Sequence, residues 1–399
     1  MKFKISQSKN RYKSQHHNQH IQKSKSISIL LTIFVTFAIL TGYSINGVNA
    51  QQTPSEKTSA LRIGYFPNIN HVQSVIGLNN GDYQKSLGNN TNVETFVFNA
   101  GPSAIEALLA KRIDVTYIGP NPAINGYVVS GGKDVRVIAG ASSGGASFIV
   151  RNDAGIESVD DLGGKKFASP QLGNTQDISL RKYIIDNGFN TVENGGNVTV
   201  VAVKPSDIVT LMLKKEIDGA WVPEPWATTL VNEANGKVFV DERDLWPPEG
   251  KFVTGNIIVR TDYLKENPDV IEKLLEAHVD ETLRINNNKE KAISEFNVQL
   301  KKLTGKTIPE NVLATAVTKM EFTYDPIKLS LIKDANNAHD LGLIENGKER
   351  PNLSNIYDLT ILDRVLAERG LDPVGGITIN NNNASNSDAS GDALADIVS

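Results

Sequence analysis

The chain has 399 residues, of which 40% are hydrophobic and 22% charged, an ordinary composition for a globular protein long enough for more than one domain. Its formal net charge is −4. The chain contains no cysteine, which excludes disulfides, thiolate metal sites and cysteine nucleophiles.

Residues 1–50 have the pattern of an export signal. Seven Lys and Arg residues without an acidic residue occupy positions 2–25, an apolar segment covers Ile27–Thr41, and Val48-Asn49-Ala50 supplies small residues for cleavage. The apolar segment is shorter than the roughly 20 residues that span a bilayer. We therefore expect a cleaved signal peptide, with an uncleaved signal anchor as the alternative. In both cases the remaining chain is expected outside the cytoplasm.

The exported part is acidic. Without the seven basic residues of the signal, 34 basic residues stand against 45 acidic ones, a net charge of about −11. Because phosphate backbones are bound by basic surfaces, nucleic acid is excluded as a partner, and so is electrostatic docking to anionic lipid.

Strand and helix patterns alternate after a polar spacer at residues 51–60. The first group comprises strands at 61–66, 93–98 and 115–118, with helical segments after residues 71 and 103. This alternation is typical of a parallel, doubly wound sheet. Further strands at 135–141 and 147–150 lead the chain out of this first lobe.

A second group repeats the plan and the chain then returns. Strands are expected at 166–168, 198–203 and 220–222, with helices at 175–186, 208–214 and 225–233. A strand at 252–260 leads back, and mostly helical segments follow to residue 369. The expected domains are lobe I, formed by residues 61–148 and 253–371, and lobe II, formed by 149–252. Two crossing segments form the hinge, and residues 372–399, rich in Asn, Ser and Asp, are expected to be a disordered tail.

An internal repeat supports two matching lobes. Residues 101–123 are echoed by residues 204–227, where a helix, a strand and a proline-rich turn follow in the same order. The two turns are Gly119-Pro120-Asn121-Pro122-Ala123 and Pro223-Glu224-Pro225-Trp226-Ala227. A duplicated α/β unit predicts two lobes that face each other across a cleft.

The loops that follow the strands carry mostly small or amide side chains and lead into helix starts. Such helix ends attract anions through unpaired N–H groups and the helix dipole, so the loops favour a small oxyanion as ligand. Glu224 would repel a bare anion; if it faces the cleft, the ligand also carries an amine or hydroxyl. If it points to solvent, the two prolines merely shape a turn. We find no catalytic motif, no cofactor site and no metal site.

Five segments of the chain resemble the extracytoplasmic substrate-binding proteins of ABC importers for sulfonates, taurine, nitrate and bicarbonate. These segments are Gly64–His71, Ala107–Asp114, Tyr117–Ala123, Ile138–Ala146 and Ala220–Trp226. The resemblance implies an α/β, two-lobed periplasmic-binding-protein type II fold that closes on its ligand by hinge motion.

The resemblance also implies function. It indicates a monomeric binding protein, without cofactor, that delivers a small-molecule oxyanion to an ABC permease and ATPase complex. We expect an aliphatic sulfonate, with taurine favoured if Glu224 lines the cleft; nitrate, bicarbonate or a pyrimidine precursor is the alternative, and an enzyme on the same fold is the rival class. Many relatives carry a lipid-anchor cysteine that this chain lacks, so its mode of anchoring stays open. By analogy the ligand contacts fall on Asn70, His71, Ser103, Asn121, Ser142, Ser143, Thr175, Gln176, Glu224 and Trp226.

Overall fold

The structure is a computed structural model that describes residues 59–344 and 349–374. All of these residues belong to one compact unit, Glu56–Ser399. The expected signal at 1–50 and nearly all of the expected tail lie outside the described residues. Within the described ranges, no helix has both the length and the apolar character needed to cross a bilayer.

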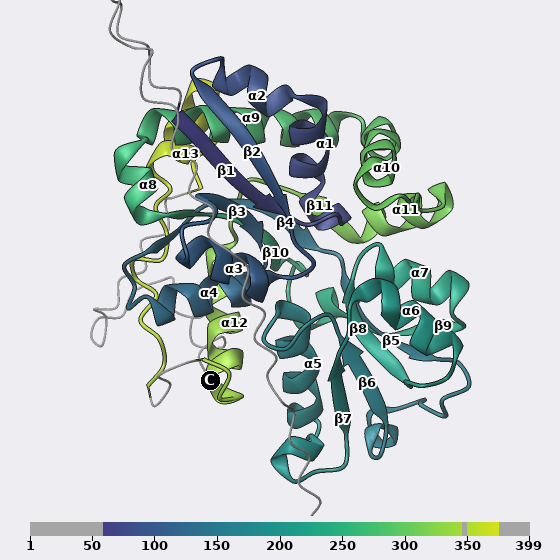
Figure 1. The fold of residues 1–399 in the computed structure, drawn as a ribbon. Helices are drawn as coiled ribbons and strands as arrows, with labels where there is room; N and C mark the ends of the chain where they lie inside the picture. The colour runs from purple at the N-terminus through teal and green to yellow at the C-terminus, as the bar shows by residue number, and fades with distance from the viewer. Residues whose placement is uncertain (1–58, 345–348, 375–399) are drawn as a thin grey trace, which may run out of the picture. The chain divides into compact units, whose positions relative to one another are not determined.

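Lobe I is built on a six-stranded sheet with the order β11-β4-β10-β3-β1-β2 (Figure 1). Its strands are β1 (Ser59–Tyr65), β2 (Thr91–Val97), β3 (Val115–Ile118), β4 (Val135–Gly144), β10 (Val253–Arg260) and β11 (Met320–Phe322). β1 runs parallel to β2 and β3, whereas β10 runs antiparallel to β3 and β4.

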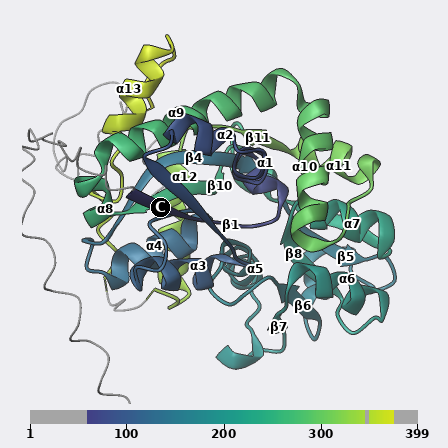
Figure 2. The same cartoon turned by 45° about the horizontal axis from the view of Figure 1, so that its top comes forward.

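Helices cover both faces of this sheet, and the alternation of side chains along β10 shows why. Ile257 and Val259 pack into a core shared with helices α1 and α9, while Ile258 packs into a second core with α3, α4 and α12. The helices of lobe I are α1 (Val72–Asn80), α2 (Asp82–Leu87), α3 (Gly101–Leu109), α4 (Pro120–Val129), α8 (Thr261–Glu266), α9 (Pro268–Asn287), α10 (Lys289–Thr304), α11 (Glu310–Ala316), α12 (Lys328–Asp340) and α13 (Thr360–Glu368). Figure 2 shows α3 and α4 on the face of the sheet opposite α1 and α9.

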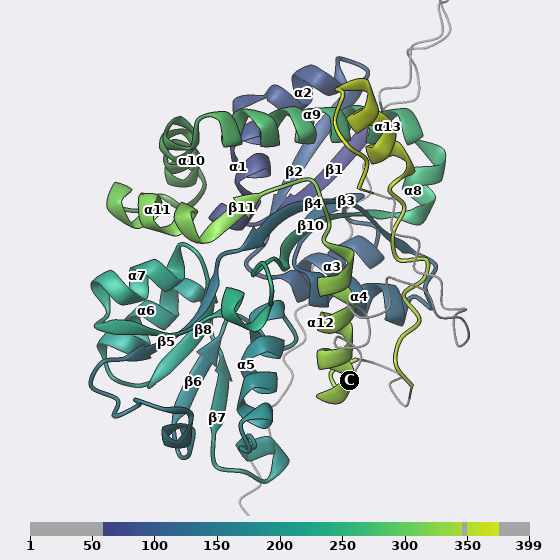
Figure 3. The ribbon, with the colours of Figure 1, turned by 180° about the vertical axis from the view of Figure 1, so that it is seen from behind.

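Lobe II has a five-stranded sheet with the order β7-β6-β8-β5-β9. Its elements are β5 (Ala146–Arg151), β6 (Lys166–Ser169), β7 (Thr199–Ala202), β8 (Gly219–Pro223), β9 (Gly236–Asp241), α5 (Thr175–Asp186), α6 (Pro205–Leu213) and α7 (Trp226–Glu233). Seen from behind, α5 flanks this sheet on one side and α6 and α7 flank it on the other (Figure 3). Trp221 is fully buried in the core of lobe II, where it stacks on Phe148 with ring centroids 5.4 Å apart.

Two segments connect the lobes. β4 passes into β5 through Gly145, so strand pairing changes sheets slightly before the expected boundary at residue 148. The chain returns after β9 through a short 3-10 turn, Glu242–Leu245, and β10 begins at Val253. Because Ser143 pairs with Val253, the outgoing and returning segments lie side by side.

Both sheets are mixed rather than purely parallel, and this differs from the sequence prediction. The chain that leaves lobe I through β4 must come back through β10 in the opposite direction, so β10 pairs antiparallel with its neighbours. β5 plays the same part in lobe II, where it is antiparallel to β8 and β9. The short strands β9 and β11 were not expected at all, because neither has a clear alternating pattern of its own.

The internal repeat is visible as two equivalent units. α3, β3 and α4 correspond to α6, β8 and α7, and each central strand lies between a parallel and an antiparallel neighbour. After the first helix of each unit the chain turns through a left-handed residue, Lys111 and Lys215, both at φ 59°. The duplicated architecture predicted from the sequence is therefore confirmed.

The same type of hydrogen bond, from a backbone N–H to an aspartate carboxylate, occurs where each central strand of the repeat begins. The carboxylate of Asp114 accepts the backbone N–H of Arg62 at 2.9 Å, and that of Asp218 accepts the backbone N–H of Lys166 at 2.8 Å. Each aspartate thus ties the entry of its strand to the neighbouring parallel strand, which keeps the two turns that follow at corresponding places in the two lobes.

Candidate functional site

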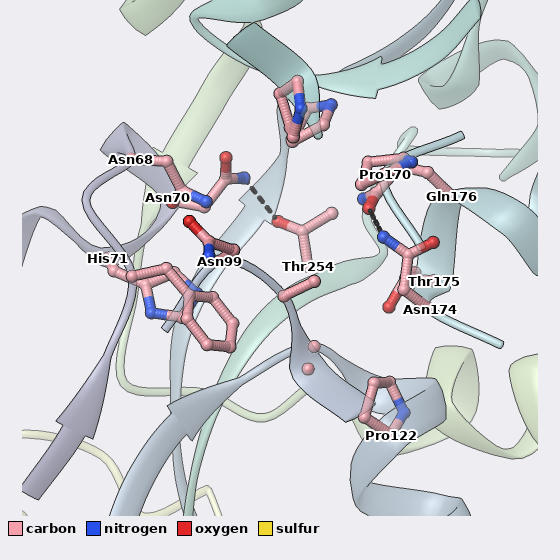
Figure 4. A pocket seen from close by; sticks show the side chains of 16 residues that line it. Asn68, Asn70, His71, Asn99, Pro122, Pro170, Asn174, Thr175, Gln176 and Thr254 are labelled. Carbon is pink, nitrogen blue, oxygen red and sulfur yellow. Dashed lines mark hydrogen bonds between the residues drawn. The ribbon is translucent and has the colours of Figure 1, made fainter. Parts of the chain in front are cut away.

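A small pocket, partly open to solvent, lies between the two lobes at the ends of the strands (Figure 4). Lobe I contributes Phe66, Asn68, Asn70, His71, Asn99, Ala100, Gly101, Gly119, Pro122 and Thr254, and lobe II contributes Pro170, Asn174, Thr175, Gln176, Pro205 and Pro223. Four of the ten residues predicted from the sequence line this pocket, namely Asn70, His71, Thr175 and Gln176.

The wall of lobe I is formed by the 3-10 turn Ile69–His71 that leads into α1. His71 is buried, and its ring lies against Phe66 with centroids 4.5 Å apart. Burial lowers the pKa of His71 to about 3, so its imidazole is neutral at pH 7. This wall therefore offers an aromatic pair and amides, without a formal charge.

Thr254 on β10 fixes the amide of Asn70. Its hydroxyl lies 2.8 Å from the carbonyl oxygen of Gly144, 3.1 Å from Oγ of Ser142 and 3.3 Å from Nδ2 of Asn70. The single hydroxyl hydrogen must go to a carbonyl, because a carbonyl can only accept. Ser142 and Asn70 then donate to Thr254, so the amide nitrogen of Asn70 faces Thr254, as Figure 4 shows.

Three polar atoms on this wall are buried without a hydrogen-bond partner among the described residues. They are Oδ1 of Asn68, Oδ1 of Asn70 and Nδ1 of His71. Because an unpaired buried acceptor costs about 1–3 kcal/mol, such atoms are expected to be satisfied when a site is occupied. In this arrangement of the lobe I wall, the hydrogen-bonding capacity of these three atoms is unmet.

The wall of lobe II is the first turn of α5, and it presents donors. Oδ1 of Asn174 caps the helix by accepting the N–H of Asp177 at 2.8 Å, so Nδ2 of Asn174 is the atom that donates to Oε1 of Gln176 at 3.2 Å. The amide nitrogen of Gln176 consequently remains available as a donor. The N–H groups of Thr175 and Gln176 belong to the first turn and have no acceptor within the helix.

The carboxylate of Asp177 fixes the position of this first turn of α5. Its buried carboxylate accepts hydrogen bonds from Ser169 Oγ at 2.7 Å, from the N–H of Gly173 at 3.0 Å and from Nε of Arg181 at 3.0 Å. These bonds connect the end of β6, the loop before α5 and the second turn of the helix. Asp177 therefore fixes the loop that carries Pro170 and Asn174 into the pocket.

The pocket combines several helix starts with an uncharged lining. α3, α4, α5 and α6 all begin at its edge, at Gly101, Pro120, Thr175 and Pro205. Among the lining residues that the structure describes, none is Asp, Glu, Lys or Arg. Helix dipoles and first-turn N–H groups favour an anion at such a place without a basic side chain.

The lobes meet closely at one edge of the pocket. A Cβ atom added to Gly119 of lobe I would lie 2.5 Å from Oγ1 of Thr175 in lobe II. Gly119 has φ −70°, so any residue could adopt its backbone conformation. Glycine is needed here because the facing lobe leaves no room for a side chain.

Five other predicted residues lie outside the lining. Their side chains engage in local structure: Ser103 donates to the carbonyl of Ala100, Asn121 donates to the carbonyl of Asp334, Ser142 contacts Thr254, Ser143 accepts the N–H of Phe252, and Trp226 packs on the core of lobe II. Whether any of them reaches a ligand stays a prediction. Ser142 is connected to the pocket indirectly, through Thr254 and Asn70.

Glu224 is also predicted as a contact, and it is not among the residues that line this pocket. It is fully buried, and its carboxylate accepts from the N–H and the hydroxyl of Thr228, both at 3.0 Å. Lys319 of lobe I lies 3.3 Å from Oε1 and pairs with it across the lobes. The solvent-facing position considered from the sequence does not describe Glu224, and whether its carboxylate reaches a ligand stays a prediction.

Sequence reasoning did not select Thr254, because it lies within a strand rather than in a loop before a helix. Asn68, Asn99 and Asn174 belong to loops that the sequence placed at the cleft, yet they were not chosen as contacts.

Among the described residues there is no group of three or more His, Asp or Glu side chains arranged to hold a metal ion.

Comparison with known proteins adds to this geometry. The model of the NMT1-like family matches residues 54–296. A relative from Brucella abortus (strain 2308) is 26% identical over 216 residues, which cover 54% of this chain and 63% of that relative. The chain thus spans less than two thirds of the length of this relative.

Two solved structures have the same fold. The alkanesulfonate-binding protein SsuA from Xanthomonas axonopodis pv. citri, bound to MOPS, superposes with a TM-score of 0.60 at 16% identity, covering 72% of this chain and 95% of that one. The periplasmic nitrate-binding protein NrtA from Synechocystis PCC 6803 superposes with a TM-score of 0.64 at 15% identity, covering 78% and 89%. These likenesses confirm the predicted two-lobed periplasmic-binding-protein fold.

Proposed function

We propose, since the chain belongs to the NMT1-like family, that it is the substrate-binding protein of an ABC importer and captures a small oxyanion between its lobes. The observation that carries this proposal is the uncharged pocket at four helix starts, with lining from both lobes. An anion held by N–H groups and helix dipoles needs no buried counter-ion, and a ligand that contacts both lobes stabilises the closed arrangement.

An aliphatic sulfonate suits this pocket. Its oxyanion end would accept hydrogen bonds from the first turn of α5, and its short carbon chain would lie near Phe66 and the prolines of the lining. The name of the Xanthomonas structural neighbour, an alkanesulfonate-binding protein, supports this class, whereas the Synechocystis neighbour makes nitrate the alternative. Glu224, whose carboxylate would favour taurine, is not among the residues that line this pocket, so taurine is not favoured over other sulfonates.

A binding role fits the pocket better than catalysis. His71 is the one titratable side chain among the described lining residues, and a pKa of about 3 makes it a weak base at neutral pH. With binding as the function, the protein would work outside the cytoplasm and hand its ligand to a permease and ATPase complex.

Isothermal titration calorimetry with ethanesulfonate, taurine, nitrate, bicarbonate and a pyrimidine tests the proposal. We expect binding of at least one sulfonate, in a one-to-one complex, with weaker or no binding of nitrate and bicarbonate. Binding of nitrate alone would contradict the sulfonate assignment. Chemical conversion of a bound ligand, followed by mass spectrometry, would contradict the binding role itself.

A further inference from the structure

The residue at which the chain first crosses between the lobes, Gly145, is hydrogen-bonded to both of them. Its N–H donates to the carbonyl oxygen of Lys319 at 2.9 Å, and its own carbonyl oxygen accepts the N–H of Glu224 at 2.8 Å. Lys319 belongs to lobe I, where it ends the 3-10 turn Val317–Lys319 that leads into β11. Glu224 belongs to lobe II and directly follows β8. The backbone of Gly145 thus connects one residue of each lobe.

The side chains of the same two residues also meet. Nζ of Lys319 lies 3.3 Å from Oε1 of Glu224. Together with the two backbone hydrogen bonds, this ion pair closes a ring around Gly145, and each lobe contributes one of the two partners. A rotation about Gly145 that moves Lys319 away from Glu224 must therefore stretch the ion pair.

Burial makes this ion pair costly to separate. The side chain of Glu224 is fully buried and that of Lys319 is only 18% exposed. Loss of one partner would leave a buried charge without its counter-charge, which is strongly unfavourable. Arg243 of lobe II is not a ready replacement for Lys319, because its guanidinium is bonded to both oxygens of Asp241, at 3.0 and 2.7 Å.

The neighbouring helices place the ion pair within a wider contact between the lobes. α11 of lobe I, which ends just before the turn that carries Lys319, contacts α7 of lobe II (Figure 3). Glu224 is bound to the start of that same helix α7, because its carboxylate accepts the N–H and the hydroxyl of Thr228. The ion pair thus connects the end of the α11 segment with the start of α7.

We propose that Lys319 is a positioning residue for ligand capture: its ion pair with Glu224 stabilises the arrangement of the lobes in which both walls of the pocket face the ligand. Lys319 is not among the described residues that line the pocket, so it acts through the lobes and not through the ligand. Apparent affinity is proportional to the fraction of molecules in the binding-competent arrangement, so the ion pair raises affinity. The inference rests on the proposed function and adds to it a residue that controls closure.

The distance between the lobes tests this role without any ligand. Because the chain has no cysteine, Glu106→Cys on α3 and Thr210→Cys on α6, both at exposed positions, provide one spin-label site on each lobe. Electron–electron double resonance on the unliganded protein should show longer distances in Lys319→Met than in the otherwise unchanged labelled protein. Lys319→Arg keeps the positive charge and should retain the original distances. Distances that do not lengthen in a folded Lys319→Met would overturn the inference.

Calorimetry with ethanesulfonate measures the consequence for binding. Lys319→Met should bind about tenfold more weakly than the wild type, a loss expected if about nine tenths of the molecules leave the competent arrangement. The matched control is Lys251→Met, because Lys251 pairs with Glu249 at 3.1 Å within the returning segment and both side chains are exposed. This control should bind like the wild type. Equal affinities of Lys319→Met and the wild type would contradict the role of Lys319.

A wild-type protein that does not bind ethanesulfonate would contradict the proposed sulfonate function, while the distances between the spin labels would still decide whether the ion pair holds the lobes. The two failures are therefore distinguishable.

Glu224→Gln tests whether Lys319 acts through this partner. The substitution removes the charge but keeps an oxygen that can accept from Thr228, so it should lengthen the distances by itself, and it provides the same test if Lys319→Met does not fold. Adding Lys319→Met to Glu224→Gln should lengthen them little further, because the ion pair is already absent. Equal lengthening by Lys319→Met in both backgrounds would show that Lys319 acts through another group. The unliganded distance is the readout because it does not depend on any contact of Glu224 with a ligand.

Discussion

At the scale of single residues, Gly119 shows how closely the two lobes approach. The site for its Cβ atom is 2.5 Å from Oγ1 of Thr175, while its backbone has an ordinary φ of −70°. The glycine is therefore explained by the partner lobe and not by the conformation of its own chain.

Gly119→Ala should weaken ligand binding with little effect on the folding of either lobe. The added methyl group opposes closure at an estimated cost of about 1–3 kcal/mol, typical of overpacking, which corresponds to a loss of affinity of about 5- to 150-fold. Calorimetry gives the affinity and thermal unfolding checks stability.

The matched control removes Oγ1 of Thr175, the atom that the added methyl group would contact. Thr175→Ala lacks Oγ1, so Gly119→Ala should have a much smaller effect when it is added to Thr175→Ala than when it is made in the wild type. Equal effects in both backgrounds would show that the two residues do not meet when the ligand is bound.

Residue-level prediction from the sequence reached the pocket lining where position follows from local chain order. Asn70, His71, Thr175 and Gln176 precede or begin helices after strands, and this placement alone brings them to the pocket. Thr254 and Glu224 could not be judged in this way. The role of Thr254 depends on neighbours more than 100 positions away, and the environment of Glu224 depends on Lys319 from the other lobe.

At the scale of elements, the start of α5 is the part of lobe II that most directly shapes the pocket. Asp177 connects this helix with the end of β6 and with the preceding loop through two hydrogen bonds, and a third joins it to Arg181 in the next turn. Its partner Arg181 is largely buried, and without Asp177 it would keep only the exposed carboxylate of Glu193, 3.8 Å away.

Asp177→Ala should destabilise the protein by about 3 kcal/mol, as is usual when one partner of a buried ion pair is removed, and should also weaken ligand binding. Urea unfolding and calorimetry measure the two effects. Asp186→Ala is the control on the same helix, because Asp186 pairs with Lys182 at the surface and its loss should cost at most about 1 kcal/mol. Similar losses in the two variants would contradict the role given to Asp177.

The elements themselves were predicted well where hydrophobic periodicity is strong. The helices near 175–186 and 225–233 are found close to their expected bounds as α5 and α7. The direction of β10 and the existence of β9 and β11 were missed, because strand direction and short edge pairings depend on the path of the whole chain. Local patterns carry no information about that path.

At the scale of the whole molecule, stability responds to pH through buried groups that act in opposite directions. Burial lowers the pKa of His71 to about 3 and that of His278 to about 4, so the unfolded chain binds protons below pH 6.5 that the native state does not. These histidines make stability fall as the pH drops from about 6.5 to 4. Burial raises the pKa of Glu242 to about 7, so this group makes stability fall as the pH rises.

Glu242 holds its proton in the native state below about pH 7 but only below about pH 4.5 when unfolded. Its contribution to stability is therefore fully present below pH 4.5 and is lost as the pH rises through 7. Because a Gln side chain does not ionise, Glu242→Gln does not lose this stability as the pH rises. The free energy of unfolding of the variant, relative to that of the wild type, should therefore increase by about 3 kcal/mol between pH 4.5 and 7.5.

Urea unfolding of both proteins across this range checks the prediction. Glu233→Gln, at an exposed position of α7, is the control and should follow the wild-type curve. Parallel curves for Glu242→Gln and the wild type would show that Glu242 is ionised in the native state throughout.

The pairing of Ser143 with Val253 also has a consequence for how this molecule can be divided. Partners in a sheet lie about 5 Å apart, so the two ends of residues 144–252 are separated by little more than one strand spacing. A segment with adjacent ends can be excised and closed on itself, and the flanking chain can be rejoined by a short turn. We therefore expect that lobe II can be joined end to end as a circular fragment, or exchanged for that of a relative, without rerouting the chain around it.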